Sequence, residues 1–428
     1  VQGSRFKLVC WSLCRRARAR KPSRALQSQK KCSCSANACD FSALQPKMGQ
    51  FLGGPVTVKG SEDGATTDSG LAWGVSAMQG WRDSMEDAHL VVPSLGSAAG
   101  LETAPEQTAA WASTALFGVM DGHGGAHVAR FCKRHLPAEI TRGNSEDLSS
   151  SLINAFHRLD QMLLEPKRID ELRALASSLS EGGGLKSWFA NPDRIGCTAV
   201  VCCVRQDDIV VANCGDSRAV LCHKGMAIDM SEDHKPNLPN ERDRITRAGG
   251  IVGVQRIGPL TQYRVNGGLN LSRSIGDHAY KMTPGLHPKD QMIIATPEIR
   301  TFKRRLADEF MVLACDGVWD VLSSQDVVDW VRQRLGNPGD LEHRISNGQL
   351  TLSRILEDML DHCLSPDLRV TFGLGGDNMT AVLVVFTALP HSAQVTRRRS
   401  LVGCGSEVAV SQNFEGPVPT NSWLCSGC

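Results

Sequence analysis

The sequence predicts an α+β fold in which the β-sheets are largely antiparallel. Six short runs have the apolar, β-branched composition of strands, at residues 115–120, 198–204, 209–212, 219–222, 310–314 and 380–386. Helical patterns lie between groups of these strands rather than after each strand. The strands between residues 198 and 230 follow one another so closely that hairpins must join them, and hairpins pair strands antiparallel. Two sheets flanked by helices fit this order.

Three segments have the periodicity of amphipathic helices, at residues 152–164, 325–335 and 352–364. The second segment has clear end signals. Ser323 and Asp326 stand at the spacing of a capping box, and Gly336-Asn-Pro338 stops the pattern. Residues 165–193 contain three consecutive glycines, so we expect an insertion loop there.

The composition divides the 428 residues into one folded domain and its flanking segments. We expect the domain to span residues 71–388, with a flexible stretch at 48–70 before it and a disordered, polar tail at 389–428 after it. Residues 1–47 hold 11 of the 47 Lys and Arg residues, so we expect this basic leader to lie outside the fold. Because Met48 follows it, translated upstream sequence explains the leader better than a targeting peptide does.

If translation starts at Met48, Gly49 becomes the second residue. Met48-Gly-Gln-Phe-Leu-Gly53 then resembles an N-myristoylation site, although Gly53 stands where Ser or Thr is usual. An ordinary flexible N-terminus explains the segment equally well, and a single acyl chain anchors a protein only marginally. No run of residues reaches the roughly 18 apolar residues of a transmembrane helix. We expect a monomer in the cytoplasm or nucleus, or at a membrane if Gly49 is acylated.

The distributions of charge and cysteine argue against two kinds of function. The net charge is +2 and the leader is strongly basic, so the remaining chain is mildly acidic and lacks the basic face that nucleic-acid binding requires. Many of the 16 cysteines stand within apolar runs, as Cys315 does, and we expect reduced thiols in an intracellular protein. Cys425 and Cys428 have no partner pair at zinc-finger spacing, which favours an unstructured tail over a zinc site.

Three aspartates stand beside glycine at the ends of predicted strands. Asp121 and Asp316 each follow an apolar run, and Asp377 precedes one. A single Asp-Gly pair is typical of a β-turn. Three carboxylates at the ends of buried strands, however, are costly without a counter-charge. A hard divalent cation supplies that charge, and oxygen ligands suit Mg²⁺ or Mn²⁺.

Other polar residues accompany these aspartates. Glu86 and Asp87 form an acidic pair, and Asp216 lies at the end of another β run. The guanidinium of Arg82 matches phosphate oxygens bidentately, with a surface ion pair to Glu86 as the alternative. His123 has three alternative roles, as a metal ligand, a core histidine or a proton donor. An oxygen-rich site argues against the first role, and an exposed turn against the second.

Eight motifs follow one another between residues 71 and 388: Gly80-Trp-Arg82 with Met85-Glu-Asp-Ala-His89, Asp121-Gly-His-Gly-Gly125, Gly196-Cys-Thr-Ala199, Ala212-Asn-Cys-Gly-Asp-Ser-Arg218, Asp233-His-Lys-Pro236, Leu271-Ser-Arg-Ser-Ile-Gly-Asp277, Ala314-Cys-Asp-Gly-Val-Trp-Asp320 and Gly376-Asp-Asn-Met-Thr380. In this order they closely resemble the signatures of the type 2C protein phosphatases. Two departures are Cys197, where Ser is common, and the length of segment 165–193. The resemblance implies a central sandwich of two antiparallel β-sheets flanked by α-helices.

The resemblance also implies a binuclear Mn²⁺ or Mg²⁺ centre. Asp121 would bridge both ions, and Gly122 would contribute its carbonyl oxygen. Asp316 and Asp377 would complete the second ion's ligands.

Four more acidic residues have implied roles around that centre. Glu86 and Asp87 would hold waters around the first ion. Asp216 and Asp320 would bind a weaker third ion. These assignments rest on the match of each residue to a family motif.

The implied reaction is the hydrolysis of phosphoserine and phosphothreonine in proteins by a metal-activated water. Arg82 would bind the substrate phosphate, His123 would protonate the leaving alkoxide, and residues 236–257 would form a flap at the site. Phosphate monoesters need a rate enhancement of up to ~10²¹-fold, and two cations both acidify a water and neutralise the phosphoryl oxygens.

Two other kinds of protein could share these sequence features. One is an inactive binding module on the same fold, which would have lost ligands. All of the acidic positions are present in this sequence. The other is a different metal-dependent phosphohydrolase, such as a nuclease or a small-molecule phosphatase. A nuclease would need a basic groove, and the chain after residue 47 shows none.

Overall fold

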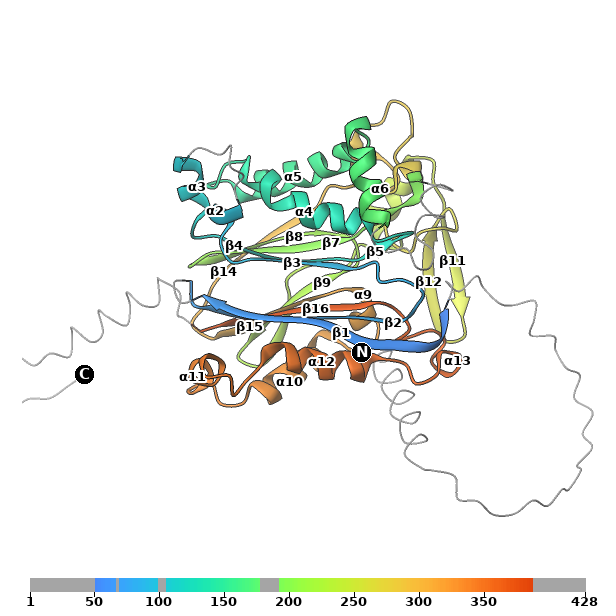
Figure 1. Cartoon of the computed structure of the whole chain (residues 1–428). Helices are drawn as coiled ribbons and strands as arrows, with labels where there is room; N and C mark the ends of the chain where they lie inside the picture. The colour runs from blue at the N-terminus through green and yellow to red at the C-terminus, as the bar shows by residue number, and fades with distance from the viewer. Residues whose placement is uncertain (1–50, 67–68, 99–104, 178–191, 388–428) are drawn as a thin grey trace, which may run out of the picture.

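The computed structural model describes residues 51–66, 69–98, 105–177 and 192–387 (Figure 1). The predicted leader at 1–47, the acylation candidate Gly49, the tail at 389–428 and the Cys425 and Cys428 pair lie outside these ranges. In the part of the chain that is described, no helix is long and apolar enough to cross a membrane.

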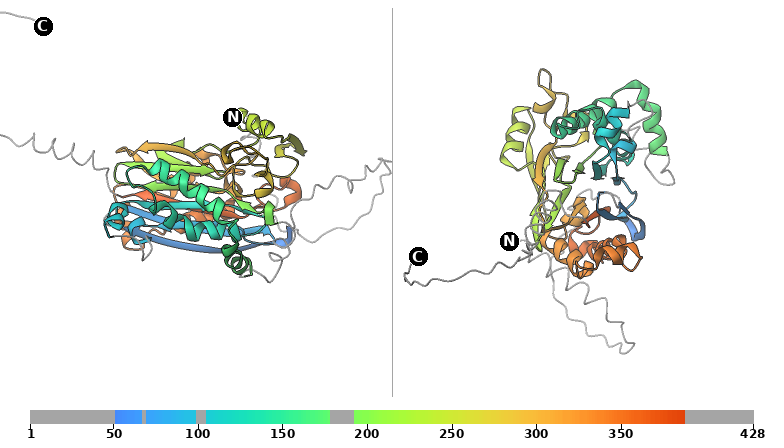
Figure 2. Two further views of the ribbon diagram at one scale, coloured as in Figure 1. Left: turned by 90° about the horizontal axis from the view of Figure 1, so that it is seen from above. Right: turned by 90° about the vertical axis from the view of Figure 1, so that its left-hand side faces the viewer.

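Two antiparallel β-sheets lie face to face at the centre (Figures 1 and 2). The first sheet has the order β1 (Phe51–Thr66), β2 (Leu71–Arg82), β16 (Met379–Phe386), β15 (Asp308–Ala314), β9 (Arg218–His223) and β10 (Met226–Asp229). The second has the order β14 (Glu298–Lys303), β8 (Asp208–Cys214), β7 (Ala199–Val204), β4 (Ala115–Met120) and β3 (Ala88–Val92). The predicted α+β class and two-sheet sandwich are confirmed.

Helices cover the outer face of each sheet (Figure 1). Over the five-stranded sheet lie α2 (Leu95–Ala98), α3 (Pro105–Trp111), α4 (His127–Thr141), α5 (Leu148–Met162) and α6 (Ile169–Ser177). Over the six-stranded sheet lie α10 (Ser324–Leu335), α11 (Leu341–Ser346) and α12 (Leu352–Cys363). Because both faces of each sheet are covered, the inner strands are almost entirely buried and their sequences are continuously apolar.

The remaining elements are short and gather mostly around one end of the sandwich. They are β5 (Gly122–His123), β6 (Gly196–Cys197), β11 (Val252–Ile257), β12 (Leu260–Val265), β13 (Ile275–Gly276), α8 (Pro239–Arg247), α9 (Asp316–Trp319), α13 (Leu368–Thr371), η2 (Pro166–Arg168), η3 (Pro192–Arg194), η4 (His278–Tyr280) and η5 (Pro288–Asp290). β11 and β12 pair as a hairpin, and β5, β6 and β13 form a small sheet of their own.

The six predicted strands and three predicted helices all occur, with shifted ends. The predicted capping box is present, because the Ser323 side chain accepts from the backbone N–H of Asp326 and the Asp326 carboxylate accepts from that of Ser323. Helix α5 begins four residues earlier than expected. Asp147 caps its start by accepting a hydrogen bond of 3.0 Å from the backbone N–H of Ser150.

The prediction that residues 48–70 are flexible is wrong for residues 51–66. This segment is β1, which pairs with β2 at the edge of the six-stranded sheet. Asp63 also accepts a hydrogen bond of 2.8 Å from the backbone N–H of Ser353, at the start of α12. Pairing with β2 and the bond to Ser353 hold β1 in place, although its Gly- and Asp-containing sequence does not indicate a strand.

The predicted insertion loop at 165–193 is helical in part. Residues 166–168 form η2 and residues 169–177 form α6, in which Leu172 and Ala176 are buried. Residues 178–191, which include the three glycines, lie outside the described ranges. The amphipathic pattern of α6 is short, and the neighbouring glycines hid it in the sequence.

The eight cysteines within the described ranges are all buried free thiols, as predicted for those positions. They fill apolar cores. Cys202 lies between the two sheets, and Cys363 lies between the six-stranded sheet and its helices.

Candidate metal centre

The predicted site residues meet at one end of the sandwich, at a cavity of about 610 Å³. Strand register brings them there. β16 begins beside the end of β2, since Met379 pairs with Met78. β15 ends where β9 begins, since Ala314 pairs with Arg218. The cavity is lined by Arg82, Asp121, Gly122, His123, Asp216, Asp316, Asp320 and Asp377. Glu86 and Asp87 do not line it but contact the same turns.

Asp121 leaves the end of β4 and is held by Thr198. The Asp121 backbone N–H donates to Thr198 Oγ1 at 3.2 Å, and the Thr198 N–H donates to the Asp121 carbonyl at 2.8 Å. Burial, together with the charges of Asp87 and Asp316, raises the pKa of Asp121 well above its usual range. A Cβ atom at Gly122 would lie 2.4 Å from the Glu86 carbonyl oxygen, so only glycine fits beside this acidic pair.

Asp316 begins the single turn of α9. Burial and the nearby carboxylates of Asp216 and Asp320 raise its pKa well above the usual range. The next position, Gly317, requires glycine, because a Cβ atom there would lie 2.0 Å from the Asn378 carbonyl oxygen. The backbone of α9 can therefore pack directly against the start of β16.

Asp87 is buried and only half satisfied. Its Oδ2 accepts a hydrogen bond of 2.7 Å from Thr380 Oγ1. Its Oδ1 is buried and accepts none from the described residues. Burial raises the pKa of Asp87 to about 7. One carboxylate oxygen thus faces the cluster without a partner, which is costly in a protein interior.

One ligand atom each of Asp87, Asp121 and Cys315 lies within 4.8 Å of the others. Burial raises the pKa of the Cys315 thiol well above its usual range, so the neutral thiol is a poor ligand and the donor set is oxygen. Buried carboxylates with raised pKa values and an unpartnered oxygen lack a counter-charge. These residues fit a hard divalent cation.

Glu86 and its backbone are fixed from three directions. Ser84 Oγ donates to its Oε1 at 2.8 Å, and the Gly125 N–H donates to its Oε2 at 3.0 Å. The Glu86 N–H donates to Asn378 Oδ1 at 2.9 Å. Asn378 also donates to the Gln79 carbonyl at 2.8 Å, so one amide joins this loop to β2. Asn378 belongs to the motif Gly376-Asp-Asn-Met-Thr380, but no sequence pattern indicates that it links these segments.

Arg82 ends β2 and pairs with Asp377, not with the predicted alternative Glu86. Its Nη2 lies 2.5 Å from Asp377 Oδ2, and 40% of its side chain is exposed. Burial alone would lower the pKa of Arg82, but the carboxylates of Asp377, Asp316 and Asp121 outweigh it and raise that pKa. The guanidinium therefore stays charged at the cavity wall.

Asp216 and Asp320, the residues predicted to bind a third ion, lie near the ammonium group of Lys235. Asp216 is buried, and its Oδ2 accepts a hydrogen bond from Lys235 Nζ. Burial would lower the pKa of Lys235, but Asp216, Asp320 and Asp316 raise it above its usual value. Asp320 is exposed at the end of α9. The Lys235 ammonium thus neutralises part of the negative charge of Asp216 and Asp320. The motif Asp233-His-Lys-Pro236 did not indicate this role.

His123 lies at the cavity and pairs with a buried carboxylate. Its Nε2 lies 2.7 Å from Asp277 Oδ2, which also accepts a hydrogen bond of 2.5 Å from Ser274 Oγ. Burial tends to lower the pKa of His123, but Asp277 outweighs it and the net shift is upward. Asp277 has a left-handed backbone with φ of 53°. Asp277 thus favours the protonated form of His123.

The loop that carries Asp277 is clamped from α5. Asp160 Oδ1 accepts hydrogen bonds from the Gly276 N–H at 2.8 Å and from Lys281 Nζ at 2.6 Å. Lys281 also donates to the Ser274 carbonyl at 2.9 Å. These contacts hold the chain before and after Asp277, at Gly276 and Lys281, and so help to keep its carboxylate beside His123. No sequence pattern indicates this role of Asp160.

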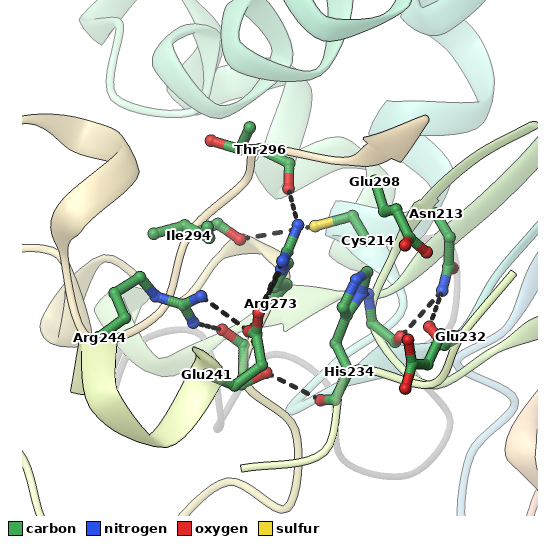
Figure 3. Close-up of polar contacts among 12 residues, drawn as sticks. Asn213, Cys214, Glu232, His234, Glu241, Arg244, Arg273, Ile294, Thr296 and Glu298 are labelled. Carbon is green, nitrogen blue, oxygen red and sulfur yellow. Dashed lines mark hydrogen bonds and ion pairs between the residues drawn. The ribbon is translucent and has the colours of Figure 1, made fainter. Parts of the chain in front are cut away.

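A second buried network joins α8 to the same segment (Figure 3). Glu241 Oε2 accepts hydrogen bonds from Arg244 Nη1 at 2.7 Å and Ser272 Oγ at 2.5 Å, and its Oε1 accepts from Arg273 Nη2 at 2.6 Å. Burial would raise the pKa of Glu241, but the two arginines lower it to about 2. The predicted flap at 236–257 thus includes α8 and β11. The cavity wall continues beyond it, through β12 to residue 271.

Comparisons with known proteins agree with this arrangement. The family described as Protein phosphatase 2C matches residues 71–369. Probable protein phosphatase 2C 11 of Oryza sativa subsp. japonica is 38% identical over 368 residues, covering 79% of this chain and 91% of that protein. Probable protein phosphatase 2C 4 of Paramecium tetraurelia is 36% identical over 347 residues, covering 79% of this chain and 98% of that protein.

Solved structures show the same fold. A phosphatase from a pathogenic strain of Toxoplasma gondii superimposes with a TM-score of 0.54 at 22% identity, covering 77% of this chain and 96% of that one. A serine-threonine phosphatase 2C from Toxoplasma gondii gives a TM-score of 0.53 at 19% identity, covering 77% of this chain and 100% of that one. With its acidic cavity and the family match over most of its folded part, the chain belongs to the protein phosphatase 2C family of metal-dependent protein phosphatases.

Proposed function

We propose that this protein hydrolyses phosphoserine and phosphothreonine in other proteins at a binuclear Mn²⁺ or Mg²⁺ centre. One observation carries the proposal. The carboxylates of Asp87, Asp121 and Asp316 lie close together and have raised pKa values, and Asp121 and Asp316 line the cavity that Arg82 and His123 also line. Arg82 and Lys235 offset only part of this negative charge, and Arg82 and His123 match a phosphoryl group and its leaving oxygen.

The ligands follow from the donor set. Two ions would be held by Asp121, the carbonyl of Gly122, Asp316 and Asp377, with Glu86 and Asp87 supporting them through waters, and a weaker third ion by Asp216 and Asp320. When bound, the ions supply an activated water and neutralise the phosphoryl oxygens.

Arg82 binds and orients the substrate in this proposal. Its guanidinium is charged, partly exposed at the cavity wall and held by Asp377, so it can meet phosphoryl oxygens without a large loss of side-chain freedom. The neighbouring carboxylates would repel a phosphate in the absence of cations. Arg82 would position the phosphoryl group, and bound cations would offset that repulsion.

His123 supplies the proton for the leaving group. One ring nitrogen is bonded to Asp277, so the other would protonate the seryl or threonyl oxygen as its bond to phosphorus breaks. Asp277 keeps the imidazolium charged and fixes the ring plane. A serine alkoxide is a poor leaving group, and protonation in the transition state is worth roughly 10²- to 10⁴-fold.

A covalent phosphocysteine mechanism does not fit the described residues. Cys363 and Arg369 stand at the Cys-x5-Arg spacing of such a site. However, Cys363 is fully buried, and Arg369 is exposed and paired with Asp367 at 2.8 Å. Nor does the cavity suit a nuclease, because the described residues that line it include five aspartates and only two arginines, Arg82 and Arg264.

We expect the purified protein to hydrolyse an aryl phosphate and a phosphothreonine peptide only when Mn²⁺ or Mg²⁺ is added. Phosphate release would be measured with each ion and with excess chelator, followed by restoration of the ion. Asp316→Asn should lower turnover by orders of magnitude, because it removes a ligand charge while keeping the shape of the side chain. Hydrolysis that continues in excess chelator would contradict the proposal.

A further inference from the structure

The catalytic cavity has more room than the reaction needs. At about 610 Å³ it lies within the range of ~300–1,000 Å³ typical of pockets that enclose whole drug-sized ligands. A phosphoryl group and one side chain fill only part of it. The remaining wall consists of residues with no role in the chemistry, among them Ile257, Leu260, Leu374 and Phe372.

Phe372 is unusual in both exposure and conformation. It follows α13, and 43% of it is exposed although it lines the cavity. Its backbone is left-handed with φ of 55°, a region that a bulky residue rarely adopts. Strained residues of this kind cluster at functional sites, where the surrounding structure maintains them. Packing of α13 does not account for an aromatic side chain at this position, because Phe372 is itself exposed.

The Phe372 ring also contacts the tip of the β11–β12 hairpin. A Cβ atom at Gly258 would lie 2.4 Å from Phe372 Cδ1, so the ring lies directly against the glycine backbone. Ile257 and Leu260 flank this glycine and are half-buried. The hairpin tip and Phe372 together form one apolar surface at the cavity, which we call the apolar wall.

One cationic side chain near the apolar wall already has hydrogen-bond partners. Arg264 lines the same cavity, but its Nε donates to Gln255 Oε1 at 2.8 Å and its Nη2 to Gln262 Oε1 at 2.8 Å. Its Nη1 donates to the Gly268 carbonyl at 2.5 Å. Its guanidinium therefore spans the hairpin and is not oriented toward an acidic ligand.

We propose that the apolar wall of Phe372, Ile257 and Leu260 is a specificity subsite that binds an apolar side chain next to the phosphorylated residue of the substrate protein. The inference rests on the proposed function, because a phosphoresidue at Arg82 places its neighbours at the cavity rim. An apolar neighbour would be removed from water against the wall. An acidic neighbour would be desolvated beside a cluster of carboxylates.

The test uses phosphothreonine peptides that differ only in the residues flanking the phosphothreonine, with Leu, Ser or Asp on either side. With Mn²⁺ present, we expect kcat/KM for the best Leu peptide to exceed that of the Ser peptide by about 5- to 20-fold, mainly through KM, and the Asp peptide to be poorest. Phe372→Ala should reduce the Leu preference to about 2-fold or less. Phe372→Leu should keep most of it.

Val370→Ala is the matched control, because Val370 is equally exposed on the same short segment but does not line the cavity. It should keep the full preference. Equal kcat/KM for all flanks, or a preference unchanged in Phe372→Ala, would overturn the subsite. If Phe372→Ala fails to fold, Ile257→Ser is judged by the same ratio. Aryl phosphate hydrolysis is measured first, because its absence with Mn²⁺ would contradict the proposed function and not the subsite alone.

Discussion

At the scale of single residues, Asp277 influences the protonation of the His123 imidazole. Asp277 is completely buried and lies 2.7 Å from the imidazole. Its charge raises the pKa of His123, so the imidazolium persists to a higher pH than an isolated histidine would allow. Removing that charge should therefore affect the proton donor without changing a proposed metal ligand.

We expect Asp277→Asn to lower turnover of a phosphoserine peptide by about 10- to 100-fold and that of p-nitrophenyl phosphate far less, because nitrophenolate leaves without a proton. The lower pKa of His123 should also shift the alkaline limb of the kcat–pH profile to lower pH. His123→Ala should show the same substrate dependence with no such limb. Equal losses on both substrates would exclude His123 as the general acid.

The sequence predicted the acidic residues of the site better than the residues that hold them. Asp121, Asp316 and Asp377 could be recognised because carboxylates beside glycine at strand ends are unusual. Asp160 and Asn378 could not, because each acts through hydrogen bonds to segments more than 100 positions away. A periodic pattern reports on a residue's own element and not on such distant partners.

At the scale of elements, Glu241 fastens α8 to the segment that leads to Asp277. It is 3% exposed and binds two arginines, of which Arg244 is itself buried. A buried carboxylate of this kind is costly to remove, because the arginines are then left without their counter-charge. Figure 3 shows that the same network reaches His234, which precedes Lys235 in the chain.

Glu241→Ala should lower the free energy of unfolding by about 3–5 kcal/mol, and Glu241→Gln by less, since Gln keeps the shape and part of the hydrogen bonding. Urea denaturation monitored by tryptophan fluorescence would measure the change. Asp243→Ala on the exposed face of the same helix is the control, with an expected change within about 0.5 kcal/mol. Similar losses in Glu241→Ala and Asp243→Ala would show that the buried network contributes little.

Elements were predictable where their own residues carry the signal. β4 and β15 are continuously apolar, and α10 has its own capping box. β1 was missed because its order depends on β2 and on the bond between Asp63 and Ser353, 290 positions away. The α8–β12 region was only partly recognised, since the contacts of its residues lie mainly in other segments.

At the scale of the whole molecule, stability depends on the apolar layer between the two sheets. Phe117 from β4 is fully buried there, and its ring centroid lies 6.0 Å from that of Trp73 on β2. The two sheets therefore contact each other through aromatic and branched side chains. The site lies at the end of this layer and depends on the alignment of both sheets.

Phe117→Ala should lower the free energy of unfolding by about 3–5 kcal/mol, because it leaves a cavity between the sheets. Thermal and urea unfolding would measure the loss. Leu306→Ala, at a position that is 65% exposed, should have little effect. Comparable melting temperatures for the two variants would contradict this account of the core.

The position of β16 has a consequence for when activity can arise during synthesis. β16 is the last strand of the described chain, yet it lies inside the six-stranded sheet between β2 and β15. The turn that leads into β16 supplies Asp377. The adjoining Asn378 bonds to Glu86 across 292 positions, and Thr380 within β16 bonds to Asp87 across 293 positions. Contacts so distant in sequence form late and slow folding. A nascent chain still holding β16 in the ribosome therefore has an unfinished sheet and no catalytic centre.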